Sequence, residues 1–144
     1  MASRFHSDRK LFKWPAGVAP ARPLITLLTD FGSRDSFVAS MKGVILSIHS
    51  EVRIVDLSHQ VVPHGIEEAA YVIASCHQYF EDGTIHVVVV DPGVGSARRS
   101  LLVTTSRQYF LAPDNGVLTR VLWNERDAES RRAMHRRTLE FGQL

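Results

Sequence analysis

The chain has 144 residues, which is room for one domain whose core needs neither disulfides nor a metal ion to fold. A single cysteine, Cys76, excludes a disulfide framework and a cysteine-based zinc site, and no apolar run approaches the roughly 18 residues that a membrane span requires. The net charge of +2 does not indicate a nucleic-acid partner, because the positive excess lies in the two ends, and residues 23–119 carry ten acidic and six basic side chains. We therefore expect a cytoplasmic protein with no nucleic-acid or membrane partner, whose middle region suits a cationic or polyhydroxylated ligand.

Residues 1–23 are basic, show no hydrophobic period and are interrupted by Pro15, Pro20 and Pro23. This composition predicts a disordered extension. A transit peptide is the alternative, because the segment contains arginine and almost no acid, although it has no amphipathic stripe.

The first ordered element is predicted at residues 24–28, a continuous apolar run of strand length that is typical of the centre of a parallel sheet. A polar turn follows at 29–32. From Asp35 to Ile48 the apolar side chains recur on one stripe, which predicts an amphipathic helix. These segments form one strand, loop and helix unit.

The same kind of unit repeats, and the sequence predicts strands over 52–57, 84–90, 101–104 and 109–112, a helix over 66–80, and a short apolar helix or strand over 117–122. The arginine-rich segment 131–137 is expected to be a solvated helix face. Strands that alternate with helices predict an α/β fold, with a mostly parallel sheet flanked by helices in three Rossmann-like layers.

Three acidic turns that contain glycine follow predicted strands, at 29–32, 91–95 and 112–116. In open α/β sheets, ligands bind beyond the carboxyl ends of the strands, where these turns fall. A single aspartate before a glycine usually caps backbone amides. Three carboxylates at one rim would repel one another, so their coincidence favours a ligand-binding site.

Asp91 and Arg98 are the strongest catalytic candidates, because a loop that contains two glycines can fold back and bring the guanidinium to the carboxylate. A carboxylate oriented in this way can hold and activate a water molecule. The alternative is an ion pair that only braces the loop. A phosphate cradle at Gly93 and Gly95 is disfavoured, since Asp91 would repel the phosphate.

Asp56 and His59 do not form a metal site in this interpretation, because two ligands at a strand end are too few and no third ligand is suitably spaced. His64, His77 and His86 are scattered along the chain. Each of these histidines, like His59, is expected to be a surface or internally hydrogen-bonded side chain.

Four motifs occur in the order and spacing of a known family: residues 28–32 with Asp35, residues 55–59, residues 89–95 with Arg98, and residues 112–119. Over residues 24–122 the chain resembles the S-adenosyl-L-methionine hydroxide adenosyltransferases. That family is related to the enzymes that make fluorinated and chlorinated adenosines.

The resemblance implies a reaction in which water attacks ribose C5′ of S-adenosyl-L-methionine, expels L-methionine and gives adenosine, with no cofactor and no metal. It implies that Asp91 and Arg98 are catalytic and handle the water, and that Asp30 holds the vicinal ribose hydroxyls. In the halogenating relatives the position of Asp91 is not an aspartate, so Asp91 favours hydroxide over halide transfer. The other substrate-binding residues that the resemblance implies are Phe31, Asp35, Asp114 and Asn115.

Members of the family continue into a C-terminal β-barrel domain, which supplies a catalytic histidine and adenine contacts across a homotrimer interface. Residues 123–144 resemble none of it, and His135 is not assigned that role. We therefore expect an N-terminal α/β domain at 24–122, a divergent or truncated tail at 123–144, and a homotrimer where the full architecture is present. The alternatives are a degenerate domain that binds adenosine or S-adenosyl-L-methionine without turnover, and a basic nucleic-acid-binding module.

Overall fold

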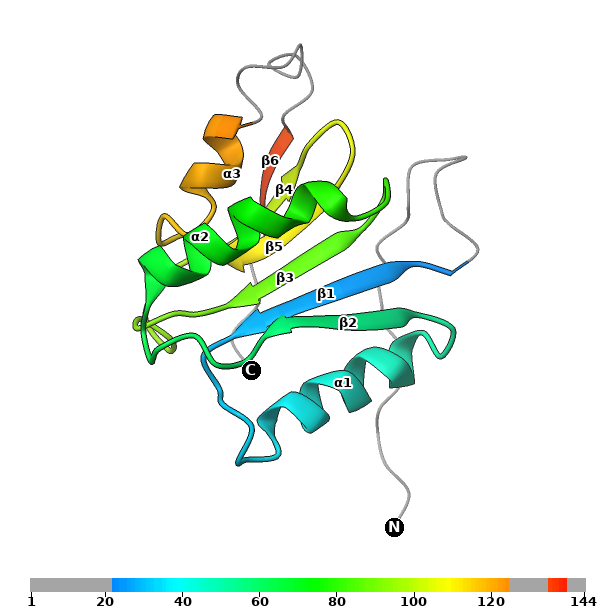
Figure 1. Cartoon of the computed structure of the whole chain (residues 1–144). Helices are drawn as coiled ribbons and strands as arrows, with labels where there is room; N and C mark the ends of the chain where they lie inside the picture. Colours follow the sequence, from blue (N-terminus) through cyan, green and yellow to red (C-terminus); the bar gives the residue numbers. More distant parts are fainter. Residues whose placement is uncertain (1–21, 125–134, 140–144) are drawn as a thin grey trace.

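The computed structural model describes residues 22–124 and the backbone of residues 135–139 (Figure 1). The predicted extension lies outside the described residues as far as residue 21, as do residues 125–134 and 140–144 of the predicted tail. The elements in chain order are β1 (Leu24–Thr29), α1 (Phe37–Ile48), β2 (Arg53–Ser58), α2 (Ile66–Cys76), the short 3-10 helix η1 (His77–Tyr79), β3 (Ile85–Val89), β4 (Ser100–Thr104), β5 (Tyr109–Pro113), α3 (Thr119–Asn124) and β6 (His135–Leu139).

The strands form one sheet in the order β2-β1-β3-β5-β4-β6. The pairs β1 with β2, β1 with β3, and β3 with β5 are parallel, whereas β4 is antiparallel to both β5 and β6. Among the described strands, β4 alone therefore runs against the others. The predicted α/β class with a mostly parallel sheet is confirmed.

The apolar run predicted to be a central strand is β1, which lies between β2 and β3 and has five of its six residues buried. In β3 burial alternates, so that His86 and Val88 are buried while Ile85, Val87 and Val89 are half-buried. This alternation places successive side chains of β3 on opposite faces of the sheet.

Most predicted elements are present, with small changes at their ends. The predicted second helix ends at Cys76 and not at Phe80, since His77–Tyr79 form η1. The segment predicted as a helix or a strand at 117–122 contributes to helix α3. The predicted helix face at 131–137 is wrong where the backbone is described, because β6 begins at residue 135 and pairs with β4. None of the helices in the described ranges is long and apolar enough to cross a membrane.

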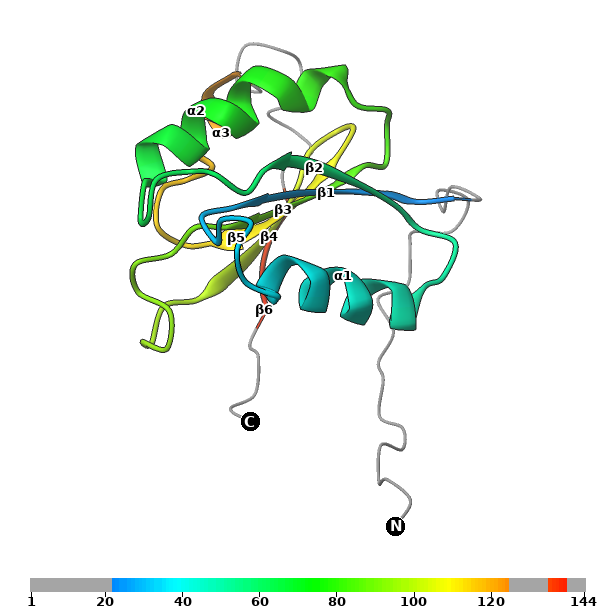
Figure 2. The same ribbon diagram turned by 60° about the horizontal axis from the view of Figure 1, so that its bottom comes forward.

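The helices make three layers with the sheet, because α2 and α3 lie on one face and α1 lies on the other (Figure 2). The face under α2 and α3, which we call the closed face, holds the hydrophobic core. Its fully buried side chains include Ile73 from α2, Phe110 from β5 and Val121 from α3. Small side chains at Ala69 and Ala70 allow α2 to approach the sheet.

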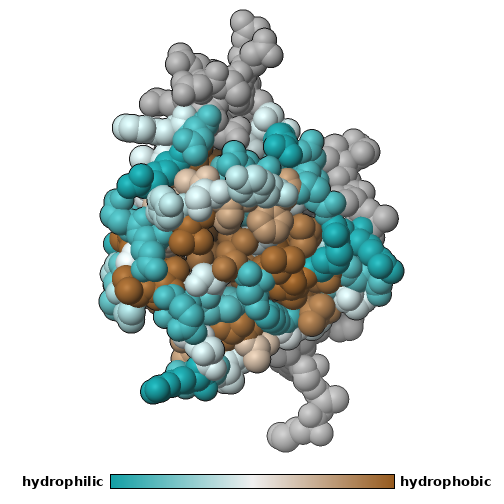
Figure 3. All heavy atoms as spheres, viewed as in Figure 1, coloured by the Kyte–Doolittle hydropathy of each residue, from teal (hydrophilic) through white to brown (hydrophobic). Residues whose placement is uncertain are grey.

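The face under α1, which we call the open face, is packed much less completely. No residue of α1 is buried, although its apolar stripe contains Phe37, Val44 and Ile48, each about 60% exposed. An open apolar groove of about 680 Å³ runs between the helix and the sheet, lined by side chains such as Met41 and Leu111. Hydrophobic side chains also reach the surface between α2 and α1, over β1 and β2 (Figure 3).

Candidate functional site

The candidate site lies at the edge of the sheet where β1, β3 and β5 end. The chain leaves β1 through α1 on the open face and reaches β3 through α2 on the closed face, so β1 and β3 flank a point where the connections diverge. In open α/β sheets, ligands bind outside the carboxyl ends of strands at such a point. Thr29 pairs with Val89, and Asp30 and Asp91 follow that pair within two residues.

The contact predicted between Asp91 and Arg98 is present. Oδ1 of Asp91 accepts hydrogen bonds from Nη1 of Arg98 at 2.8 Å and from the backbone N–H of Gly93 at 2.9 Å. The Asp91 side chain is 11% exposed and that of Arg98 is 31% exposed. Partial burial strengthens a charge-assisted hydrogen bond, so this pair fixes the orientation of the carboxylate.

Gly93 is required by the close approach of the guanidinium. A Cβ at this position would lie 2.6 Å from Nη2 and 2.8 Å from Cζ of Arg98. The absent side chain therefore makes the space through which Arg98 reaches Asp91. Ser96 closes the loop from the other side, because its hydroxyl donates to the Gly93 carbonyl at 2.6 Å and accepts from the Arg98 backbone N–H at 3.3 Å.

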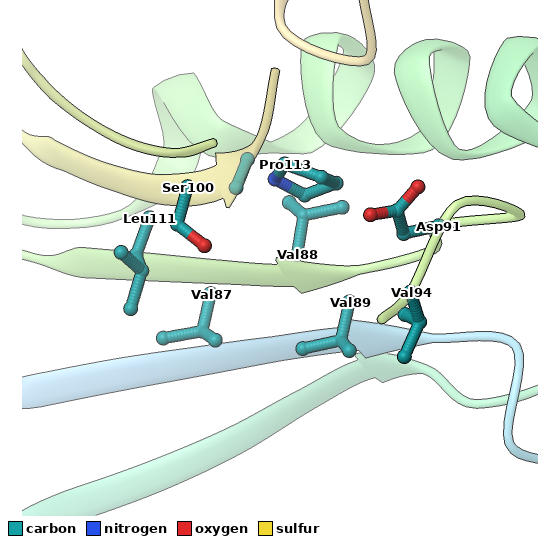
Figure 4. Close-up of a pocket in the computed structure, with 9 residues that line it drawn as sticks. Val87, Val88, Val89, Asp91, Val94, Ser100, Leu111 and Pro113 are labelled. Carbon is teal, nitrogen blue, oxygen red and sulfur yellow. The ribbon is translucent and has the colours of Figure 1, made fainter. Parts of the chain in front are cut away.

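A small cavity of about 200 Å³ opens beside Asp91 (Figure 4). Pairing between β3 and β5 ends at Val87 and Leu111, and the cavity lies where these two strands separate. The carboxylate points over β3 towards Pro113. Its Oδ2 accepts no hydrogen bond from the described residues, so the protein fixes one carboxylate oxygen and leaves the other without a partner among those residues, while Val87, Val89 and Val94 point to the other side of β3.

Asp30 lies in the turn after β1 and is half-buried. Its Oδ2 accepts a hydrogen bond from the backbone N–H of His64 at 2.9 Å. A backbone hydrogen bond to the segment after β2 also stabilises the turn, because the N–H of Gly32 donates to the His59 carbonyl at 2.7 Å. Gly32 has a φ of 70°, a left-handed conformation that glycine adopts without strain. The other carboxylate oxygen of Asp30, Oδ1, has no hydrogen-bond partner among the described residues.

Phe31 and Asp35 occupy the segment between β1 and α1. The Phe31 ring packs against Phe37 with the ring centroids 5.7 Å apart, and the backbone N–H of Phe31 donates to Oγ1 of Thr29 at 3.2 Å. Asp35 is exposed just before the helix. Phe31 thus borders the Asp30 turn, while Asp35 is held less firmly.

Asn115 connects the turn after β5 to the end of β3. Its Nδ2 donates to the Val90 carbonyl at 2.9 Å, and its Oδ1 accepts from the Val117 backbone N–H at 3.1 Å. The amide side chain therefore connects the ends of the two separating strands. Asp114 instead lies 3.6 Å from Nη2 of the exposed Arg99 and faces outwards.

The three acidic turns do meet at one edge, but each carboxylate has a local partner. Asp91 pairs with Arg98, Asp114 with Arg99, and Asp30 with a backbone N–H. These contacts reduce the repulsion that the sequence alone led us to expect. In the part of the chain that the structure describes, no three histidine, cysteine or acidic side chains lie close enough together to hold a metal ion.

Two residues near the site, Thr29 and His59, were given no role in the site from the sequence, in which His59 was considered as half of a metal pair with Asp56 and set aside. Nδ1 of His59 lies 2.9 Å from Oγ1 of the fully buried Thr29. His59 is internally hydrogen-bonded, as expected, but its position directly behind the Asp30 turn was not foreseen. The available signal was its place at the end of a strand next to β1.

The comparisons with known proteins agree with one another. A family model described as the SAM hydroxide adenosyltransferase N-terminal domain matches residues 25–140. The (R)-S-adenosyl-L-methionine hydrolase of Methanocaldococcus jannaschii is 43% identical over 103 residues, covering 68% of this chain and 39% of the relative. A fluorinase of Actinopolyspora mzabensis is 30% identical over 125 residues, covering 71% of this chain and 42% of the relative.

Among solved structures, an uncharacterized conserved protein from Thermotoga maritima is similar with a TM-score of 0.73 and 36% sequence identity. The similarity covers 81% of this chain and 43% of that chain. This chain thus spans about two fifths of the length of the curated relatives that it matches.

Proposed function

This chain belongs to the SAM hydroxide adenosyltransferase family, and from that premise we propose that it hydrolyses S-adenosyl-L-methionine to adenosine and L-methionine. The observation that carries the proposal is the state of Asp91. One of its carboxylate oxygens is fixed by Arg98 and Gly93, and the other is free beside a cavity. A water molecule is the nucleophile that such a carboxylate can orient.

In the proposed reaction, Oδ2 of Asp91 accepts a hydrogen bond from the water. This bond orients the water so that a lone pair of the water oxygen faces ribose C5′. The new bond joins the water oxygen to C5′ while the bond from C5′ to the sulfonium breaks. The electron pair of that bond leaves with L-methionine, whose sulfur becomes a neutral thioether. One water proton passes to Asp91 and then to solvent. A sulfonium needs no protonation to leave, so positioning and electrostatics suffice.

The remaining predicted residues would form the substrate pocket. Asp30 has one free carboxylate oxygen, which suits the vicinal hydroxyls of ribose. Asn115 keeps one N–H and one lone pair after its bonds to the backbone. The pocket would be completed by Phe31, Asp35 and Asp114. The negative charge of these turns suits a substrate that carries a sulfonium cation.

Hydrolysis would need no cofactor, because the sulfonium itself supplies the leaving group. We expect the protein to act in the cytoplasm without a nucleic-acid or membrane partner, and as a homotrimer where the family's full architecture is present. The negative charge of Asp91 opposes a halide at the position of the water, so we expect hydroxide transfer and no halogenated adenosine.

The test is to incubate the full chain with S-adenosyl-L-methionine in water enriched in heavy oxygen and to quantify adenosine and L-methionine. The wild type should give both products, with the label in the 5′-hydroxyl of adenosine. Asp91→Asn should lower the rate by about 100-fold or more, because it removes the charge that orients the water.

Asp82→Asn is the matched control. Asp82 also pairs with an arginine, Arg107, at 2.5 Å near the opposite edge of the sheet, but it is 73% exposed, so this control tests the loss of a paired carboxylate away from the site. Equal rates in Asp91→Asn and the wild type would refute a catalytic role for Asp91. Binding of S-adenosyl-L-methionine with no product in any variant would identify the chain as a non-catalytic binding domain.

A further inference from the structure

A chain of polar contacts lies behind the Asp30 turn and links β2 to β1. Nζ of Lys42 donates to Oδ2 of Asp56 at 2.6 Å, and Nε2 of His59 lies 3.1 Å from Oδ1 of the same carboxylate. On its other side, Nδ1 of His59 lies 2.9 Å from Oγ1 of Thr29. The His59 side chain is 12% exposed and Thr29 is fully buried, so the inner part of this chain of contacts is shielded from solvent, whereas Asp56 and Lys42 are partly exposed.

One tautomer of the His59 ring accounts for the order of donors and acceptors. A carboxylate can only accept, so the tautomer with the proton on Nε2 faces Asp56, and Nδ1 then accepts from the Thr29 hydroxyl, whose oxygen also accepts from the Phe31 backbone N–H. Nε2 and Oδ1 of Asp56 are 3.1 Å apart, but their geometry is not that of a hydrogen bond. Burial raises the pKa of Asp56, but the neighbouring Lys42 and His59 outweigh it, so the pKa is lowered and the carboxylate stays charged.

The register of the sheet puts His59 in this place. The pairing of β1 with β2 shifts by one residue between Leu27, which pairs with Asp56, and Leu28, which pairs with Ser58. The irregularity advances β2 relative to β1, so His59 stands level with Thr29. Bulges of this kind redirect side chains and are frequent beside functional sites.

The segment that follows His59 also contacts the Asp30 turn. The Gly32 backbone N–H donates to the His59 carbonyl at 2.7 Å, and the His64 backbone N–H donates to Oδ2 of Asp30 at 2.9 Å. His64 has a φ of 66°, an uncommon conformation for a residue other than glycine. Such a conformation persists where the surrounding contacts impose it, and it aims this N–H at Asp30.

We infer that His59, acting through Thr29, is a positioning residue that holds Asp30 in the orientation needed to bind the ribose hydroxyls of the substrate. The inference rests on the proposed function and adds to it the device that aligns the ribose-binding carboxylate. His59 itself touches no substrate. Its ring joins the charged Asp56 to the buried Thr29 hydroxyl, which fixes the backbone of Phe31 beside Asp30.

The sharpest variant is Thr29→Val, which removes the hydroxyl at nearly constant shape. Thr29→Ser restores the hydroxyl and is the conservative rescue. Thr84→Val is the matched control, because Thr84 is also fully buried and its hydroxyl donates to the Glu81 carbonyl before β3, at the opposite edge of the sheet. Asp56→Asn provides a second route, since this side chain is 38% exposed and its replacement leaves the core intact.

The first measurement needs no ligand and follows hydrogen exchange at the His64 amide in the full chain. Thr29→Val should speed this exchange by about fivefold or more, the equivalent of roughly 1 kcal/mol of lost protection, although neither partner of the Asp30–His64 bond is altered. Thr29→Ser should restore the protection, and Thr84→Val should leave it unchanged. Unchanged exchange in Thr29→Val, or in Asp56→Asn should the first variant not fold, would overturn the inference.

The second measurement compares the affinities for adenosine and 2′-deoxyadenosine by calorimetry. The wild type should prefer adenosine, and Thr29→Val should reduce that preference by about fivefold, since a displaced Asp30 no longer distinguishes the two sugars. An equal loss of both affinities would indicate a purely structural role and contradict the inference. If the wild type binds neither nucleoside, the proposed function fails, and the exchange result alone decides whether the network holds Asp30.

Discussion

The two faces of the sheet differ in how far their helices bury them. On the closed face, Ile73, Phe110 and Val121 are fully buried between the sheet and the helices α2 and α3. On the open face, α1 carries an apolar stripe of similar character, yet Val44 and Ile48 remain about 60% exposed above an open groove. An amphipathic pattern therefore shows which side of a helix is apolar, while burial depends on the other elements that cover it.

The strand ends that carry the candidate site are packed on the closed face. Val88 and Val90 in and after β3, and Ala112 and Val117 around the end of β5, belong to the buried cluster and lie next to Asp91 and Asn115 along the chain. Packing on this face consequently fixes the strand ends from which the loop of Asp91 and Arg98 leaves. Val87 and Leu111 line both the cavity beside Asp91 and the open groove, so the open face is best tested by substitutions on α1, away from the site.

The largest expected effect is a loss of stability in acid, caused by the buried His86 on the closed face. Burial, assisted by the neighbouring His77, lowers the pKa of His86 to about 4 from its ordinary 6.5. The unfolded chain therefore binds a proton between these pH values that the folded chain does not, so stability is full above pH 6.5 and falls as the pH drops towards 4. The loss should reach about 3 kcal/mol in the free energy of unfolding, measured with urea at several pH values.

His86→Leu removes the titrating ring and should flatten the pH dependence over this window. It also leaves Oγ1 of Thr26 without its contact to Nδ1 of His86, at 2.7 Å, so the variant should be less stable than the wild type at neutral pH. Equal slopes for wild type and variant between pH 6.5 and 4 would show that another group causes the acid response.

A matched pair of helix substitutions compares the faces directly. Val121→Ala on α3 and Val44→Ala on α1 delete the same atoms from a fully buried and a 60% exposed side chain. We expect a loss of about 2 kcal/mol for Val121→Ala, and a change within about 0.5 kcal/mol for Val44→Ala. Urea unfolding of the full chain measures both values. Similar losses at the two positions would mean that the open face is covered in solution.

A small effect on stability is also expected at the site loop, which belongs to neither face. Gly93→Ala places a methyl group against the Arg98 guanidinium, which can move aside because it ends a flexible side chain. The free energy of unfolding should change by less than about 1 kcal/mol, while adenosine formation falls by about tenfold as Asp91 loses its partner. If Gly93→Ala forms adenosine as fast as the wild type, the contact between Arg98 and Asp91 is not required for the reaction.

Part of this organisation could be predicted from the sequence because it is local. The apolar run of β1 and the β-branched run of β3 indicate buried strands wherever they occur. The contact of Asp91 with Arg98 spans seven residues of one glycine-containing loop, so chain geometry alone permits it.

The rest depends on contacts between distant segments. The bond from His59 to Thr29 joins residues 30 positions apart and requires the register shift between β1 and β2, which no periodicity in the sequence encodes. The early end of α2 reflects the pairing of His77 with Gln108, 31 positions away. The backbone of residues 135–139 forms a strand because β4 offers it an edge to pair with, so the arginine pattern alone favoured the wrong structure.

The pairing of Thr29 with Val89 also limits how this chain can change in length. One residue inserted into β1 or β3 would turn every following side chain of that strand to the opposite face, and it would separate Asp30 from Asp91. The exposed segment 33–36 before α1 lies outside the paired strands, so insertions there leave the pairing intact. The number of residues between each aspartate and the last paired residue before it is therefore the feature of this chain that is least free to vary.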